Sequence, residues 1–253
     1  MRTRLDRWLT LLGICSRSAG KDLIRKGAVL VNGRAAADPG AEVETEEDSL
    51  TVRGQAVDGR VLRHVMLNKP AGILTAARDR KQPTVMDLLP PVYSGIGCMP
   101  VGRLDKDTMG LLLLTCDGEL NHRLLAPGRH VDKVYEAEVT GELREDDVLA
   151  FAEGLPLGDF TALPARLEIL AAGPGRSAGR VTVREGKFHQ VKRMFAAAGH
   201  EVLSLRRISF GPLTLPDSLP EGAWRELTAE ELDLLREAAG LQPRNGPRSG
   251  RTE

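Results

Sequence analysis

The sequence predicts an α+β protein with a small N-terminal domain and a larger second domain. The first 27 residues carry apolar side chains at helical spacing, and a short strand with a turn follows them. Beyond residue 61, apolar residues gather in short runs that Gly and Pro separate, which is typical of strands in a sheet. With 253 residues, 42% of them hydrophobic, the chain can bury a large core. We expect a small α/β domain over 1–60 and, over 61–239, a mixed, mainly antiparallel β-sheet with flanking helices.

Two helices are expected at the start of the chain. The apolar residues of the first lie three and four positions apart, at Leu5, Trp8, Leu9 and Leu12. This spacing predicts a helix over 4–12, which Gly13 ends. Either Ser16 or Ser18 can cap a second helix, which runs to Gly27.

Strands complete the small domain. The run over 28–31 is apolar and precedes Asn32-Gly33, a pair that favours a tight hairpin. A last strand is expected over 49–52. The Gly59-Arg60 stretch after it is where we place the domain boundary.

The second domain is predicted to combine strands with four helices. Its strands are expected over 65–67, 111–115, 134–139, 167–170 and 180–183. Its helices are expected over 83–89, 120–125, 145–154 and 189–198. The segment over 240–253 is rich in Pro, Gly and Arg with no apolar face, so we expect a disordered tail there.

The formal net charge is zero, but the charges are segregated along the chain. Residues 1–34 hold eight basic residues against two acidic ones, and an acidic block follows over 38–48. A second basic cluster lies over 180–207. Two separated basic clusters predict a polyanionic partner.

Composition also excludes several classes of protein. No apolar run approaches eighteen residues, and charges interrupt the apolar residues of the N-terminus. We therefore expect neither a membrane span nor a signal peptide. We expect a cytoplasmic protein. Cys15, Cys98 and Cys116 lie far apart, which suits isolated thiols rather than a disulfide or a zinc site. The Gly-rich stretch over 172–179 lacks the context of a phosphate-binding loop. We expect no metal and no cofactor.

Asp105 is the first candidate for chemistry. It stands in GRLDKDTMGLLLLTCDG, over 102–118, just ahead of a strongly apolar strand. An acid so placed suits an active site, but an Asp in a Gly-bounded loop is more often a turn residue or a helix cap. Asp105 and Asp107 could also form a metal pair, yet no His, Cys or third acid stands at ligand spacing nearby. The local pattern alone leaves catalysis and turn formation open.

The N-terminal elements and their residues, RLDRWLTLLGICSRSAGKDLIRKGAVLVNG, resemble the S4-type RNA-binding domain. The likeness spans about the first sixty residues. It implies that the second helix and the adjoining loop meet the RNA backbone. The residues that it places on the phosphate-facing side are Arg17, Lys21, Arg25, Lys26 and Arg34. A generic helical hairpin with a solvated charged face is the alternative, and the VNG turn favours the S4 domain.

Four segments of the second domain, in order, resemble the RsuA-type pseudouridine synthases. They are MLNKPAGI, GRLDKDTMGLLLLTCDGEL, KVYEAEV and EGKFHQVKRMFAAAGHEV. These enzymes carry an S4 domain ahead of the catalytic domain, and the likeness runs from about Arg4 to Leu232. The HQVKRMF string is closest to the members that act on small-subunit rRNA, whereas relatives acting on large-subunit RNA more often carry an Arg-rich variant there.

The resemblance implies a role for five residues. It makes Asp105 the catalytic carboxylate, and it makes Lys192 the basic partner that keeps this carboxylate ionised and oriented. Tyr135 matches the aromatic residue that stacks on the target base. Arg103 matches the arginine that enters the RNA helix where the target nucleotide leaves, and Met194 matches an apolar position lining the uracil pocket.

The sequence therefore predicts an RNA pseudouridine synthase that acts on a specific uridine of small-subunit 16S rRNA, free or in an assembling particle. We expect a monomer. Activity on large-subunit rRNA or tRNA is the first alternative, and a non-catalytic RNA-binding protein of ribosome assembly is the second. A glycosidase would require a second acid facing Asp105 across the substrate, and the neighbouring Asp107 is poorly placed for that.

Overall fold

The computed structural model describes residues 1–129 and 131–243, and its first elements confirm the predicted helices, strand and hairpin. These elements are β1 (Arg2–Arg4), α1 (Leu5–Leu11), α2 (Arg17–Arg25), β2 (Val29–Val31), β3 (Arg34–Ala35), β4 (Glu42–Glu44), β5 (Leu50–Val52) and β6 (Gln55–Val57). Ser16, not Ser18, caps α2, since its side chain accepts from the backbone N–H of Ala19. Asn32 and Gly33 both have positive φ, as the hairpin between β2 and β3 requires.

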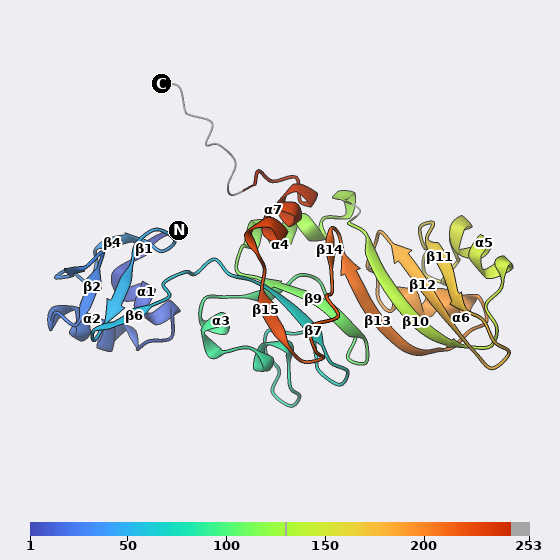
Figure 1. Ribbon diagram of the computed structural model, residues 1–253, viewed down its shortest axis with the longest axis horizontal. Helices are drawn as coiled ribbons and strands as arrows, with labels where there is room; N and C mark the ends of the chain where they lie inside the picture. The colour runs from blue at the N-terminus through green and yellow to red at the C-terminus, as the bar shows by residue number, and fades with distance from the viewer. Residues whose placement is uncertain (130, 244–253) are drawn as a thin grey trace, which may run out of the picture.

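The N-terminal elements form their own small core. The strands make a sheet in the order β3-β2-β5-β6, and β1 pairs separately with β4. Leu5, Trp8, Leu9 and Ile24 pack beneath the sheet at 1% exposure or less. The predicted spacing of apolar residues on α1 is therefore the spacing that builds this core. Figure 1 shows the unit in blue at one end of the molecule.

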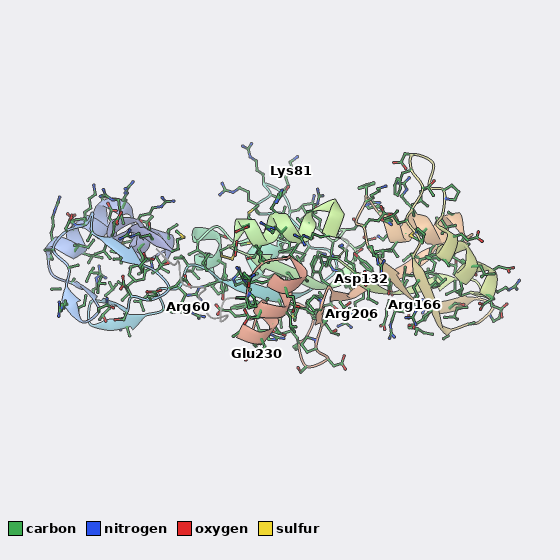
Figure 2. The ribbon with its side chains drawn as sticks, turned by 90° about the horizontal axis from the view of Figure 1, so that it is seen from above. Arg60, Lys81, Asp132, Arg166, Arg206 and Glu230 are labelled. Carbon is green, nitrogen blue, oxygen red and sulfur yellow. A yellow bond between two sulfur atoms is a disulfide. The ribbon has the colours of Figure 1, made fainter. Side chains whose placement is uncertain are left out.

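The connection to the rest of the chain, residues 58–63, is held from both sides. The indole N–H of Trp8 donates to the Gly59 carbonyl at 2.7 Å. Arg60 and Arg63 each form an ion pair with Glu226, at 3.1 and 2.8 Å. Figure 2 labels Arg60 at this junction.

The second part is built on one large mixed sheet, which confirms the α+β class. Its strands are β7 (His64–Lys69), β8 (Met99–Pro100), β9 (Met109–Thr115), β10 (Lys133–Thr140), β11 (Arg166–Ala171), β12 (Arg176–Val183), β13 (Val202–Phe210), β14 (Leu213–Thr214) and β15 (Trp224–Glu226). The order is β11-β12-β10-β13-β9-β7-β15, with β8 on β9 and β14 on β13. Each pairing between its named strands is antiparallel except that of β9 with β13.

Helices and short helical turns cover this sheet. They are η1 (Val85–Leu88), α3 (Pro91–Gly95), α4 (Gly118–Leu125), η2 (Pro127–Arg129), α5 (Glu145–Glu153), α6 (Gln190–Ala197) and α7 (Ala229–Ala238). Figure 1 shows α4 and α7 together over the middle of the sheet and α5 at the end remote from the N-terminal unit. No helix within the described ranges has the length and hydropathy to cross a membrane.

Strand β9 is buried on both faces, which explains its unbroken apolar run. Leu112 and Leu114 belong to the larger core cluster, whereas Leu111 and Leu113 belong to a second cluster that includes residues of α4 and α7. Successive side chains of a strand point to opposite faces, so one strand supplies both cores. The loop that carries Asp105 is thus anchored directly to the centre of the sheet.

Several predictions need correction. The helix expected over 83–89 is the short 3₁₀ turn η1. Strand β13, which lies between β9 and β10, was not predicted, nor was α7. The tail expected over 240–253 begins after α7, and its residues 244–253 lie outside the described part.

The prediction of isolated cysteines was wrong for two of the three. Cys98 and Cys116 form a disulfide, and their Cα atoms lie 4.1 Å apart. The physical reason is the pairing of β8 with β9, in which Met99 faces Thr115, so the residues flanking this pair are cross-strand neighbours. Cys15 alone is a free thiol.

Candidate active site

The segment over 101–108, between β8 and β9, carries Asp105 and is fixed by two buried side chains. The Lys69 ammonium, at the end of β7, donates to the carbonyls of Lys106 and Thr108 at 3.1 and 3.0 Å. The Thr75 hydroxyl donates to the Leu104 carbonyl at 2.8 Å and accepts from the Leu104 N–H at 3.2 Å. Asp105 therefore stands on a backbone that is bonded on both sides.

Asp105 and Tyr135 line the same cleft, together with Arg103 and Lys192. The other lining residues include Leu104, Thr108, Val183, Glu185, Lys187, His189, Gln190 and Leu205. Tyr135 comes from β10 at the centre of the sheet and is 8% exposed. Its hydroxyl has no hydrogen-bond partner among the residues that the structure describes. The structure thus brings together four of the five residues to which the resemblance gave a catalytic or pocket role.

The contact of the Asp105 carboxylate differs from the prediction. Its Oδ1 lies 3.4 Å from Nε2 of His189, the residue that caps the N-terminus of α6. Lys192 instead places its Nζ 2.6 Å from both carboxylate oxygens of Asp107. The expected pairing of Lys192 with Asp105 is therefore wrong in this structure.

A turn explains this exchange of partners. The Thr108 N–H donates to the Asp105 carbonyl at 3.1 Å, so the chain reverses between the two acids. Asp107 then meets the ammonium of Lys192, and this bond holds the pKa of the Asp107 carboxyl below its usual range. Because the Asp107 side chain is 73% exposed, solvent screens the pair, and its contribution to stability is small.

Two further predicted residues, Arg103 and Met194, lie in different surroundings. Arg103 is exposed at the cleft and has no side-chain partner among the described residues, so its guanidinium is available to a ligand. Met194 is fully buried in the larger core and is not among the residues that line the cleft, so its place in a uracil pocket stays a prediction. Gln190, one helical turn before Met194 on α6, occupies the lining position, and its Nε2 lies 3.9 Å from the Met194 sulfur.

The loop over 185–190 was not predicted from the sequence, yet it forms one wall of the cleft. The Gln190 amide donates to Glu185 at 2.8 Å and accepts from the Lys187 N–H at 3.1 Å. Glu185 also accepts from the Leu163 N–H at 2.8 Å. The Glu and Gln at the two ends of the EGKFHQ string were the available signal for such a network.

The basic residues assigned to RNA contact lie on α2, at its C-cap and on β3. Arg17 contacts the buried Asp6 at 3.4 Å, and Arg25 lies 3.8 Å from Asp22. The other three, Lys21, Lys26 and Arg34, have no side-chain partner within the described residues. Most of this charge is therefore free to meet an anion.

Neither the cleft nor any other described region gathers three or more His, Cys, Asp or Glu side chains in a way that could hold a metal ion. The cleft lining instead combines two carboxylates, Asp105 and Glu185, with the Tyr135 ring and several cations, and Glu185 is bound to the Gln190 amide.

Comparison with known proteins identifies this arrangement. The family model described as RNA pseudouridylate synthase matches residues 63–197, more than half of the chain, and includes Arg103, Asp105, Tyr135 and Lys192. The chain belongs to the RNA pseudouridylate synthase family. A second model, the S4 domain, matches residues 3–49 of the N-terminal unit. The pseudouridylate synthase is therefore an isomerase with an S4 domain at its N-terminal end.

Full-length similarity extends to individual proteins. A ribosomal small subunit pseudouridine synthase A from Pseudomonas aeruginosa is 41% identical over 90% of this chain and 98% of its own length. A ribosomal large subunit pseudouridine synthase B from Bacillus subtilis is 36% identical over 93% of this chain and 96% of its own. A crystal structure of a pseudouridylate synthase is 34% identical, covers 92% of this chain and 99% of that one, and has a TM-score of 0.64.

Proposed function

We propose that this pseudouridylate synthase isomerises one uridine of small-subunit ribosomal RNA, with Asp105 as the catalytic carboxylate. The observation that carries the proposal is the placement of Asp105 and Tyr135 in one cleft, the acid at 29% side-chain exposure and the ring almost buried. An acid at this depth is accessible to a flipped nucleotide and partly shielded from water.

The reaction breaks the bond from uracil N1 to the ribose C1′ and forms a bond from C5 to the same carbon. C5 loses a proton and N1 gains one, so no oxidant or group donor is consumed. An ionised carboxylate can act beside the sugar as a nucleophile or base, and a closed pocket retains the detached uracil while it turns. Asp105 fits the first task and the Tyr135 ring fits the second, because stacking holds a base without fixing its rotation.

The cations around the cleft favour a polyanionic substrate. Arg103 is exposed and unpaired within the described residues, and a planar guanidinium can both stack on bases and bond to phosphate. Lys187 and Lys192 line the same cleft. We propose that Arg103 occupies the space that the target nucleotide leaves and that Lys192 meets the backbone beside it.

We propose that residues 1–60 grip the RNA next to the target and that residues 61–239 perform the isomerisation. The gripping surface consists of Arg17, Lys21, Arg25, Lys26 and Arg34. Extraction of a base from paired RNA costs a few kcal/mol, and a broad electrostatic contact offsets part of that. We also propose, as the sequence predicts, that the protein is a cytoplasmic monomer.

The choice of the small subunit rests on two observations. The small-subunit relative is 41% identical to this chain and the large-subunit relative 36%. The HQVKRMF string over 189–195 also resembles the small-subunit members more closely. The large-subunit target is the second candidate, since the match to that relative also covers 93% of this chain.

Purified protein incubated with separate transcripts of small-subunit rRNA, large-subunit rRNA and tRNA tests the proposal. We expect one pseudouridine in the small-subunit transcript and its loss with Asp105→Asn. Asp107→Asn is the matched control, because Asp107 is a neighbouring acid outside the cleft lining. Pseudouridine only in large-subunit rRNA or tRNA refutes the target, and full activity of Asp105→Asn refutes the catalytic assignment.

A further inference from the structure

Phe188 is the most exposed large hydrophobic residue of the described chain. Its exposure is 74%, whereas the other exposed large hydrophobic residues lie between 43 and 54%. It packs against neither core of the sheet. An exposed aromatic ring beside the candidate active site offers a face on which a nucleobase can stack.

The ring is nevertheless held in place. Phe188 stacks on the imidazole of His189, with centroids 3.8 Å apart and planes 18° from parallel. His189 has a φ of 50°, in the left-handed region that non-glycine residues rarely adopt, and its Nε2 lies 3.4 Å from Asp105. One face of Phe188 is therefore covered by a residue that touches the candidate catalytic acid, and the opposite face is open.

Phe188 lines a second hollow that adjoins the cleft. The two share Arg103, Leu104, Asp105, Gly186, Lys187 and His189 as walls. The far side of the second hollow comes from the chain after β7, with Leu74 and Ala76, and from Lys106. Arg103 thus stands between two adjoining spaces, one with Tyr135 and the other with Phe188.

We propose that this hollow binds a second nucleobase of the RNA, adjacent to the target uridine, stacked on the open face of Phe188. The inference rests on the proposed function of the neighbouring cleft. A flipped uridine leaves its neighbour unstacked on one side, and base–aromatic stacking restores that contact for any base. Arg103 lines both hollows, so the guanidinium that we propose in the vacated space then stands between the two bound nucleotides.

Kinetics separate this role from a structural one. Phe188→Leu removes the aromatic face, and because the residue is exposed the fold is unaffected. We expect the KM for the modified transcript to rise about 5- to 150-fold, with kcat changed less than threefold, since stacking of this kind contributes about 1–3 kcal/mol. Phe188→Trp keeps the low KM. Leu149→Ala, at an exposed apolar residue of α5, is the control for loss of surface area.

A binding measurement keeps the inference distinct from the proposed function. The probes are single-stranded RNA decamers with a central uridine and 2-aminopurine immediately 5′ or 3′ of it. We expect wild type and Phe188→Trp to quench one of the two probes and Phe188→Leu to leave both bright, whether or not any transcript is modified. Equal quenching by wild type and Phe188→Leu, or an unchanged KM in an active Phe188→Leu enzyme, overturns the inference while leaving the catalytic proposal intact.

Discussion

Lys69 supports the loop of the candidate active site through a buried charge, and this charge has a measurable consequence. The residue is fully buried, and its ammonium donates to the carbonyls of Pro70, Lys106 and Thr108. Burial lowers the pKa of Lys69 to about 8, against the opposing pull of Asp107 and Asp105. Lys69→Met keeps the length of the side chain and removes the charge.

The direction in which stability changes with pH follows from the protons that the folded and unfolded chains bind. Between pH 8 and 10.5 the unfolded chain keeps the proton on Lys69 while the folded chain loses it, so stability rises with pH. A shift of this size corresponds to about 3 kcal/mol, because each pKa unit is about 1.4 kcal/mol. Below pH 8 the folded protein carries the full free-energy cost of burying the Lys69 ammonium. The Met variant has no charge at this position and therefore no such cost at any pH.

Urea unfolding of both proteins at pH 7, 8, 9 and 10.5 provides the test. We take the free energy of unfolding of wild type minus that of Lys69→Met. We expect this difference to change little near pH 7 and to rise by about 3 kcal/mol, in favour of wild type, by pH 10.5. Lys133, whose pKa burial also lowers to about 8, titrates in both proteins and cancels in the difference. A difference that stays constant from pH 7 to 10.5 would show that burial does not lower the pKa of Lys69.

Three further outcomes are expected. Asp107→Asn removes the exposed ion pair with Lys192, so urea unfolding should show less than about 1 kcal/mol of change; a larger loss contradicts the solvent screening described above. Tyr135→Phe should keep both the stability and the RNA affinity measured by filter binding, because the hydroxyl has no partner among the described residues. Tyr135→Leu should weaken RNA affinity about tenfold, because it removes the stacking ring. Equal affinities of the two variants would contradict stacking. Gly110→Ala should destabilise the protein by about 3 kcal/mol or more in urea, since its φ is +99° and a Cβ there would lie 2.2 Å from the Arg207 carbonyl oxygen; wild-type stability contradicts that crowding.

Local chemistry made parts of the fold predictable from the sequence. The Ser cap of α2, the Asn32-Gly33 hairpin and the apolar run of β9 each depend on residues close in sequence. The cleft was also predictable in outline, because Asp105 and Tyr135 lie in segments that resemble the family's motifs and the structure brings them together.

Long-range geometry limited the rest. Strand β13 mixes polar and apolar residues because buried and exposed positions occur along it, and its Arg207 is buried with its Nε donating to the Leu111 carbonyl. The partner of Lys192 depends on the turn between Asp105 and Thr108, which brings Asp107 to the helix. The residues in these two contacts lie 85 and 96 positions apart in the sequence. The spacing of residues along the chain predicts helices and strands, but it does not predict contacts between elements so far apart.

Mapping of pseudouridine in total ribosomal RNA, from cells that lack this protein, tests the role of Asp105 most directly. The cells are complemented with wild type, Asp105→Asn or Asp107→Asn, each expressed to the same level. We predict that one small-subunit uridine loses its modification and that wild type and Asp107→Asn restore it while Asp105→Asn does not. Restoration by Asp105→Asn, or unchanged rRNA in the cells without the protein, would contradict the account.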